Sequence, residues 1–334
     1  MSIAFKSQAN AVPVLGGDAL AIDPSAEVQR IGEAVRDQVR RTLRRRGVVV
    51  GLSGGIDSSV TAALCAAALG ADRVLGVLMP ERDSDPESLR LGQLVAEALG
   101  IASVIEDIAP ALDALQCYAR RDALIRELVP DFGTGWTCKL VLEPTLRSQG
   151  YNISYLTVCS PAGLVERHRL SPDAYLGIVA AANMKQRTRK QIEYYHADRL
   201  NYAVAGTPNR LEYDQGFFVK NGDGAADVKP IAHLYKTQVY DLAEHLGIPD
   251  EIRTRPPTTD TWSMPQSQEE FYFAVPFAIM DVCLGALNSG ASREETAAAS
   301  GLTVAQVEAV WRDIAAKRKV AVYLRAPALT VEPV

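Results

Sequence analysis

Cysteine and histidine are scarce in this chain of 334 residues, which has five cysteines and four histidines. The cysteines are Cys65, Cys117, Cys138, Cys159 and Cys283, and no two of them form a C-x-x-C pair. No histidine lies at ligand spacing from any of them. Because zinc sites need such clusters of sulfur and nitrogen ligands, a zinc site is not expected. The cysteines are predicted to be free thiols that are mostly buried.

The chain also lacks a long apolar run, a leader pattern and an excess of basic residues. No run reaches the ~18 apolar residues of a membrane span, and no signal-peptide pattern opens the sequence. The formal net charge is −5, which disfavours nucleic acid as the main ligand. A cytoplasmic protein is expected, with neither a membrane nor a nucleic acid as partner.

The most informative stretch is residues 47–59, Gly-Val-Val-Val-Gly-Leu-Ser-Gly-Gly-Ile-Asp-Ser-Ser. An apolar run is followed by small and polar residues and then by a helix-forming tract, so the pattern predicts strand, tight loop and helix N-terminus. The free N–H groups and the dipole of a helix start favour an anion. Gly54 and Gly55 let the backbone approach a phosphate. Asp57 would repel that phosphate unless a cation bridges them, which implies Mg²⁺.

This loop is neither a Walker loop, which needs a Lys-Ser/Thr pair, nor a Gly-x-Gly-x-x-Gly fingerprint. It resembles the Ser-Gly-Gly-x-Asp-Ser loop of the ATP pyrophosphatases, which bind the pyrophosphate of ATP and adenylylate a substrate. The alternative is a glycine-rich turn with incidental polar residues. We favour the phosphate loop because its residues match in order and in context.

Strand and helix patterns alternate along most of the chain. Strands are expected at 73–80, 102–108 and 202–206 as well as before the loop, and helices at 25–43, 88–99, 172–199 and 233–246. This alternation predicts an α/β fold with a doubly wound parallel sheet, which binds its ligands at the carboxyl ends of the strands.

Residues 1–24 are irregular and are predicted to form a flexible arm, followed by a single domain at 25–325. The alternation breaks at about 109–165, where a helix at 113–128 and an extended stretch at 155–158 are the only clear signals. This insert exceeds an ordinary connection, so a lid, a dimer element or a substrate-selecting element all remain open. Residues 253–268 are rich in Pro, Thr and Ser and are predicted to be a mobile lid, and helices fill most of 269–319.

Polar residues that follow the strand at 202–206 are expected to share a crevice with Asp57. Thr207 and Glu212 come directly after its end. A second carboxylate beside a triphosphate suits Mg²⁺, which takes a few protein oxygens together with phosphate oxygens. Further on, Lys220 and Asp227 flank a glycine-rich loop, and Lys236 opens a helix, where it can neutralise a phosphate as a mobile point charge.

Taken together, these segments resemble the NAD synthetases, ATP-dependent ligases that amidate deamido-NAD. The resemblance covers roughly residues 28–108 and 172–325, and implies an adenine nucleotide alpha hydrolase-like fold. The matching segments are the loop at 53–59, the Asn-x-Lys-x-Arg-x-Arg run at 183–189, Gly206-Thr207 with Glu212, residues 216–230, Leu234-Tyr235-Lys236-Thr237, Pro257-Thr258 and Lys317-Arg318.

The resemblance also implies roles for individual residues. Asp57, Lys220 and Lys236 are implied to be catalytic, and Asp57 and Glu212 to bind Mg²⁺. The residues implied to bind ATP are Ser53, Gly54, Gly55, Asp57, Ser58, Ser59, Thr207, Lys236 and Thr258. The residues implied to lie on the deamido-NAD side are Arg187, Lys220, Asp227 and Lys317.

The short arm cannot be the fused hydrolase domain of a glutamine-using member, so the resemblance is to the ammonia-dependent form. A homodimer is expected, and a separate glutaminase subunit stays possible. Several segments depart from the family pattern, among them residues 208–211, 269–276 and Ala316. A related enzyme that amidates a different carboxylate is therefore an alternative.

Three further alternatives are less favoured. Residues 292–319 read as a helix-turn-helix, for which DNA binding competes with a hairpin packed on the domain. An enzyme that acts on RNA usually has a reactive cysteine pair or an added RNA-binding domain, and neither is evident. A catalytically dead regulator is disfavoured because Asp57, Glu212 and Lys236 are all present. The basic stretch at 40–46 is interpreted as a solvated helix end rather than a nucleic-acid patch.

Overall fold

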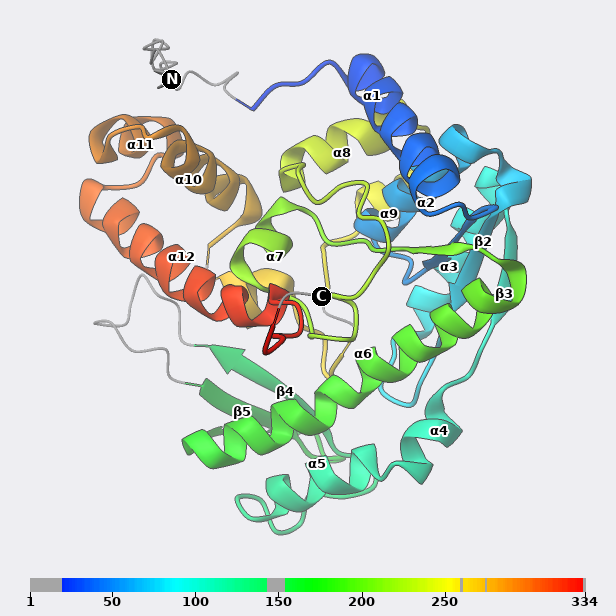
Figure 1. The fold of residues 1–334 in the computed structure, drawn as a ribbon. Coiled ribbons are helices and arrows are strands. Elements are labelled where there is room, and N and C mark those ends of the chain that lie inside the picture. The colour runs from blue at the N-terminus through cyan, green and yellow to red at the C-terminus, as the bar shows by residue number, and fades with distance from the viewer. Residues whose placement is uncertain (1–19, 143–153, 259–260, 274, 333–334) are drawn as a thin grey trace.

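The computed structural model of the protein describes residues 20–142, 154–258, 261–273 and 275–332. Within them, a parallel sheet has the strand order β3-β2-β1-β7, and a separate antiparallel sheet has the order β4-β5-β6 (Figure 1). The strands are β1 (Val48–Gly51), β2 (Val74–Leu78), β3 (Ala102–Ile105), β4 (Thr137–Leu142), β5 (Ser154–Cys159), β6 (Val165–Arg169) and β7 (Ala203–Ala205). The predicted α/β fold with a parallel sheet is confirmed.

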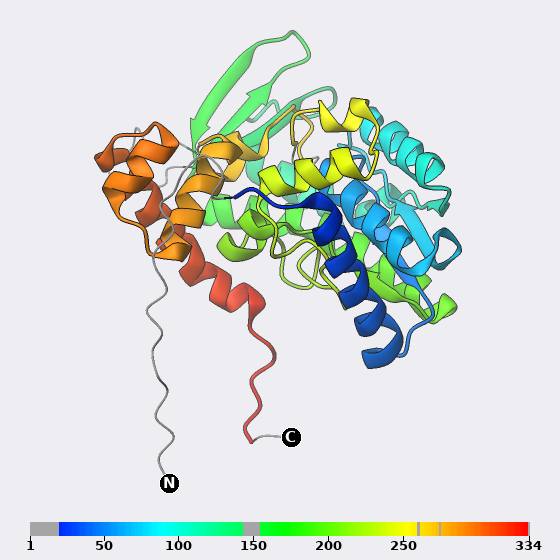
Figure 2. The same ribbon diagram turned by 90° about the horizontal axis from the view of Figure 1, so that it is seen from above.

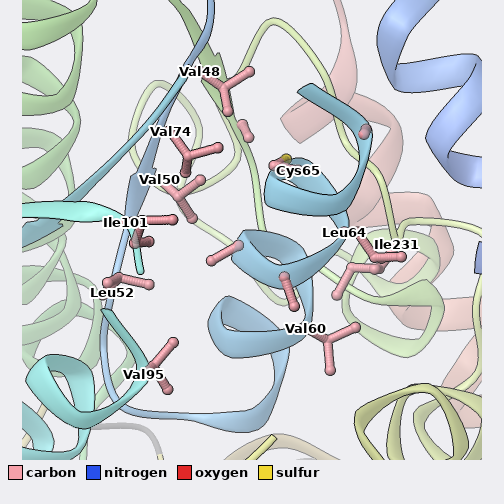
Figure 3. Packing of buried hydrophobic residues seen from close by; sticks show 14 of the residues in the cluster. Val48, Val50, Leu52, Val60, Leu64, Cys65, Val74, Val95, Ile101 and Ile231 are labelled. Carbon is pink, nitrogen blue, oxygen red and sulfur yellow. The ribbon is translucent and has the colours of Figure 1, made fainter. Parts of the chain in front are cut away.

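Strand β1 lies in the middle of the parallel sheet, where Val48 pairs with Val74 of β2 and with Ala203 of β7. Its valines are fully buried because helices cover both faces, as is usual for parallel strands. Figure 3 shows Val48 and Val50 packed toward helix α2 (Ile56–Leu69). Val49 belongs to the core on the other face.

Two layers of helices enclose this sheet. Helices α1 (Pro24–Arg36), α2, α3 (Pro86–Leu99) and α8 (Lys236–His245) supply the core on one face. The long helix α6 (Pro172–Leu200), with α4 (Ala109–Ala114) and α5 (Cys117–Arg126), covers the other (Figure 1). The remaining elements are η1 (Asp37–Thr42), η2 (Ala71–Arg73), α7 (Arg210–Gln215), α9 (Asp250–Arg253), η3 (Glu269–Phe273), α10 (Phe277–Ser289), α11 (Arg293–Ser300) and α12 (Val304–Arg325).

The N-terminal helix packs against the C-terminal end of α2. Arg36 and Arg40 donate to the carbonyls of Ala68 and Leu69, at 3.4 Å and 3.2 Å. Cations placed there offset the helix dipole, so part of the basic stretch has partners within the fold. Residues 1–19 of the predicted arm lie outside the described residues. Leu20 is packed, since its carbonyl accepts from Gln238 at 2.9 Å.

The predicted insert contains α4, α5 and the strands β4 and β5 of the antiparallel sheet. The single helix expected at 113–128 is wrong, because Gln116 adopts a left-handed φ of 58° and divides it into α4 and α5. The sheet packs on α5 and on the first half of α6 through a core that includes Cys138, Leu156 and Ile178. Figure 2 shows the sheet at one side of the molecule. Four of the five cysteines are buried free thiols and Cys159 is half-buried, as predicted.

The C-terminal helices form a further packed unit. Met280 and Leu284 of α10 share a core with Val310 and Ile314 of α12, so the possible helix-turn-helix is a hairpin packed on the rest of the fold. The segment Phe271–Ser289 is long and apolar enough to cross a membrane by length and composition alone, although 47 % of it is buried. Its described residues include the end of η3 and the whole of α10, and core packing of the kind seen here accounts for its apolar character.

We predict that Leu64→Ala lowers the free energy of unfolding by about 2–5 kcal/mol, because it opens a cavity beneath the parallel sheet. Leu64 of α2 is 0 % exposed. The measurement is urea unfolding followed by circular dichroism. Leu176 of α6 is 62 % exposed, so Leu176→Ala is the matched control and should change stability by about 0.5 kcal/mol or less. Equal losses in both variants would contradict the assigned core.

Candidate functional site

The loop between β1 and α2 has the predicted strand–loop–helix form. Gly55 is the N-cap of α2 and offers no side chain to the first amides of the helix. Its carbonyl accepts from the hydroxyls of Ser58 and Ser59, at 3.0 Å and 2.8 Å. The Ser53 hydroxyl lies 3.2 Å from that of Ser58. The loop is therefore held by its own hydroxyl groups, with the N-terminus of a helix of 14 residues beneath it.

Helix α3 packs directly against this loop through two glycines. Gly54 has a φ of +70°, and a Cβ at this position would lie 2.6 Å from the Ser88 carbonyl and 3.1 Å from the Gly92 nitrogen. A Cβ on Gly92 would lie 2.8 Å from a methyl of Leu78. Glycine is required at position 54 both by its backbone conformation and by the close approach of α3.

A cleft of about 410 Å³ opens at the carboxyl ends of β1, β2 and β7. Most of the predicted ATP-binding and metal-binding residues line it: Ser53, Gly54, Gly55, Asp57, Ser58, Thr207, Glu212 and Thr258. Ser59 does not; it is fully buried and supports the loop from below through Gly55. Lys236 is also outside the lining but reaches Asp57 from behind, where the two form an ion pair.

Asp57, Lys236 and Glu212 are brought together by Asn209. The Asn209 side-chain amide donates to Asp57 at 3.0 Å, and its backbone N–H donates to Glu212 at 3.0 Å. The second contact is half of the capping box that begins α7. Gln268 donates to the other oxygen of Glu212 at 3.1 Å. The N-termini of helices α2, α7 and α8 therefore meet at this cluster.

The charges of this cluster balance only while Glu212 keeps its proton. Burial, together with the negative charge of Asp57, raises the pKa of Glu212 to about 8. Burial opposes protonation of Lys236, but Asp57 and Glu212 prevail and raise its pKa, so the ammonium stays charged. One cation thus faces two carboxylates, and a further cation would stabilise the ionised form of Glu212.

Magnesium fits this donor set. Asp57 and Glu212 offer hard oxygen ligands at the edge of the cleft, where phosphate oxygens could complete the shell. In the described part of the chain, no group of three or more His, Cys, Asp or Glu side chains forms a metal site.

The sequence reasoning missed part of the cleft wall. Gln186, Arg189 and Glu193 line the cleft from α6, and Arg189 donates to the Ser84 hydroxyl at 3.3 Å. Lys185 is 1 % exposed and binds Glu81 at 2.9 Å beneath them. Lys185, Arg189 and Glu193 follow one another at intervals of four residues, which places them on one helix face and could have identified them. Other lining residues missed are Glu81, Asp85, Asp223, Arg255 and Gln268.

The residues predicted on the deamido-NAD side do not line this cleft. Lys220 donates to the carbonyls of Tyr323 and Ala326 at the end of α12, at 2.9 Å and 3.0 Å. Arg187 is exposed and donates to the Lys220 carbonyl at 3.2 Å. Asp227 is exposed, and its carboxylate accepts the Val204 N–H at 2.8 Å. The structure brings Arg187 and Lys220 together, and Asp227 supports the end of β7.

Lys317 has a different environment from the one predicted. It is 8 % exposed, forms an ion pair with Asp313 at 2.5 Å and donates to the Tyr272 carbonyl at 2.6 Å. Its ammonium is therefore used to hold η3 against α12. These contacts give no support to the prediction that Lys317 lies beside substrate phosphates.

Comparison with known proteins identifies the relatives of this chain. The NAD synthase family model matches residues 27–129 and 153–321. An NH(3)-dependent NAD(+) synthetase of Rhizobium rhizogenes (strain K84) is 63% identical over 320 residues, which are 96% of each chain.

Two solved structures share the fold. The NMN synthetase of Francisella tularensis has a TM-score of 0.63 at 22% identity and covers 92% of this chain and 98% of its own. The NH3-dependent NAD synthetase of Campylobacter jejuni has a TM-score of 0.61 at 20% identity and covers 93% and 100%. At these identities the likeness concerns the fold alone.

We predict that Glu212→Gln makes the free energy of unfolding less sensitive to pH. Between the ordinary pKa of 4.5 and about 8, folded Glu212 keeps its proton while unfolded Glu212 loses it. Unfolding then releases a proton, so the wild type loses stability as the pH rises through this range. Glutamine cannot titrate and still serves a capping box. The stability of the variant relative to the wild type should therefore increase from the acidic to the alkaline end, as measured by urea unfolding.

Glu295→Gln is the matched control, because Glu295 occupies the same position in the capping box of α11. Hydrogen bonds from the Ser292 backbone and hydroxyl lower the pKa of this exposed carboxyl, so it is already ionised throughout the range. Its stability difference from the wild type should not vary with pH. A constant difference for Glu212→Gln as well would show that Glu212 ionises normally.

Proposed function

The chain belongs to the NAD synthase family, as its motifs predicted, and from this membership we propose that it converts deamido-NAD, ammonia and ATP to NAD, AMP and pyrophosphate. One observation carries the proposal: the loop that marks an ATP pyrophosphatase faces Thr207, Glu212 and Thr258 across one cleft. An ATP triphosphate placed on that loop lies beside the cluster of Asp57, Glu212 and Lys236.

The reaction has two steps: the first transfers the adenylyl group to a carboxylate oxygen, and the second transfers the acyl group to the nitrogen of ammonia. A nicotinate carboxylate oxygen attacks the α-phosphorus of ATP, and the bond to the β-phosphate oxygen breaks to release pyrophosphate. Ammonia then attacks the acyl carbon, and AMP leaves with the former carboxylate oxygen. Both steps concentrate negative charge, so positioned cations and N–H donors lower the barrier. The start of α2 supplies N–H donors here, and the charge of Lys236 lies behind Asp57.

Magnesium belongs to the proposal as the ion held by Asp57 and Glu212. When bound, it would neutralise phosphate charge and orient the triphosphate. Lys236 keeps Asp57 in place from behind, and Asn209 fixes the separation of the two carboxylates by contacting both. Ser53 and Ser58 offer hydroxyls to the phosphates from the loop.

For the second substrate, we propose that Arg187 and Lys220, which touch each other, belong to the deamido-NAD side. Asp227 acts through the backbone of β7, and Lys317 acts by holding η3. A homodimer, a cytoplasmic location and free ammonia as the nitrogen source complete the proposal. A separate glutaminase subunit would appear as NAD formation from glutamine, without added ammonium, once the partner is supplied.

The decisive assay incubates the purified protein with ATP, magnesium ions, ammonium and deamido-NAD. NAD, AMP and pyrophosphate should form in equal amounts. AMP that forms only with another carboxylate would assign the chain to a related ligase. A complete lack of pyrophosphate release with every carboxylate tested would reject the adenylylation chemistry.

We predict that Asp57→Asn lowers kcat by about a hundredfold or more, because it removes a charged ligand of the magnesium ion that would neutralise the reacting phosphates. Asp72→Asn, whose side chain is 76% exposed just after α2, is the control and should retain wild-type turnover. Circular dichroism checks that both variants fold. Wild-type turnover in folded Asp57→Asn would remove Asp57 from the site, whereas loss of folding would make it structural.

We also predict that the mass in solution is that of a dimer, measured by light scattering. A monomer at assay concentration with full activity would contradict the dimer.

A further inference from the structure

The loop that follows Thr258 is docked on the antiparallel sheet rather than free. Thr258 and Ser267 form an isolated antiparallel bridge, and the Gln268 N–H donates to the Pro257 carbonyl at 3.2 Å. Pro257, Thr258 and Gln268 line the cleft, so the two ends of the loop are part of the candidate ATP site. Residues 261–266, which we name the docked segment, lie between those ends and contact β4.

Hydrogen bonds join the docked segment to the outer edge of β4. Cys138 donates its N–H to the Ser263 hydroxyl at 2.9 Å, and its carbonyl accepts the Met264 N–H at 3.2 Å. Further along the strand, the Gln266 side chain donates to the Leu140 carbonyl. An exposed strand edge carries unpaired backbone groups that attract another segment. Here the segment that follows the ATP site uses them.

Apolar packing strengthens this attachment. Trp262 is 5 % exposed and belongs to the core of the antiparallel sheet together with Leu140, Leu156 and Ile178. Burying an indole is among the largest apolar contributions that a single residue can make. Trp262 therefore acts as the anchor of the docked segment.

A buried ion cluster attaches the start of the docked segment to the cleft wall. Lys185 donates to the Thr261 carbonyl at 2.8 Å and also binds Glu81 and Asp83, at 2.9 Å and 2.7 Å. Glu81 itself lines the cleft. The docked segment is thus fixed between the parallel sheet, through Lys185, and the antiparallel sheet, through Trp262.

We infer that the antiparallel sheet positions the ATP site: by binding the docked segment through Trp262, strand β4 holds Thr258 and Gln268 against the cleft. Gln268 in turn holds the Glu212 carboxyl in place through their hydrogen bond of 3.1 Å. Strand β4 lies within residues 130–152, which the NAD synthase match leaves out. This support for the ATP site therefore comes from a part of the chain outside the family match. Trp262 is a positioning residue, and the inference rests on the proposed use of ATP.

The test compares Trp262→Ala with Trp136→Ala by calorimetric titration with ATP and magnesium ions, without any acyl substrate. Loss of preorganisation at Thr258 and Gln268 should raise the Kd for ATP about tenfold in Trp262→Ala. Trp136 packs on the same core, but its aromatic neighbour is Phe132 rather than the docked segment. Trp136→Ala should lose thermal stability while keeping its ATP affinity within about twofold.

Two further variants keep the inference falsifiable if Trp262→Ala does not fold. Trp262→Phe should bind ATP as the wild type does, because the indole nitrogen has no hydrogen-bond partner among the described residues. Ser263→Ala combined with Gln266→Ala removes side-chain bonds to β4 and keeps every side chain of the apolar core that holds Trp262, and should weaken ATP binding in the same direction.

The outcomes separate the two proposals. Wild-type protein that does not bind ATP would contradict the proposed function. Wild-type protein that binds ATP, with unchanged affinity in Trp262→Ala or in the Ser263 and Gln266 double variant, would overturn the positioning role. Equal loss of affinity in Trp136→Ala would overturn it too, because the effect would then be one of general stability.

Discussion

The ion pair between Lys236 and Asp57 is the interaction on which the candidate site depends. A fully buried ammonium is tolerated only beside a carboxylate. If α8, which carries Lys236, moved away from Asp57 at the start of α2, both charges would be left without a partner. Glu212 lies in the same space, where burial and the charge of Asp57 raise its pKa to about 8 and keep it protonated at neutral pH. A cation that arrives with the triphosphate would favour the ionised form of Glu212, so the site suits a triphosphate that brings its own cation.

Helix α6 connects this electrostatic centre with the rest of the molecule. Its 29 residues pack on the antiparallel sheet at one end and on the parallel sheet at the other (Figure 1). Lys185 and Arg189 lie between these two contacts and face the cleft wall. Helix α6 thus sets the separation of the two sheets. The docked segment bridges the sheets at the cleft, so α6 also sets the distance that it spans.

The sequence allowed the parallel sheet and the phosphate loop to be predicted because their signals are local. A buried strand reads as an apolar run, and the loop carries its own hydroxyls and glycines. Helix α7 was missed inside a glycine-rich stretch, although the capping box of Asn209 and Glu212 was readable. Partners distant in sequence could not be predicted: nothing near Lys317 indicates the Tyr272 carbonyl as its contact, and nothing near Trp262 indicates β4.

The contact of Gly54 with α3 has a consequence for how this sequence can vary. The phosphate loop and the first turns of α3 touch with no side chain between them, because Gly54 faces the Ser88 carbonyl and the Gly92 backbone. A bulkier residue at position 54 therefore cannot be accommodated by rotating a neighbour; it has to move a backbone. Helix α3 therefore limits which residues the phosphate loop can tolerate. A redesign of nucleotide preference has to change the loop and α3 together.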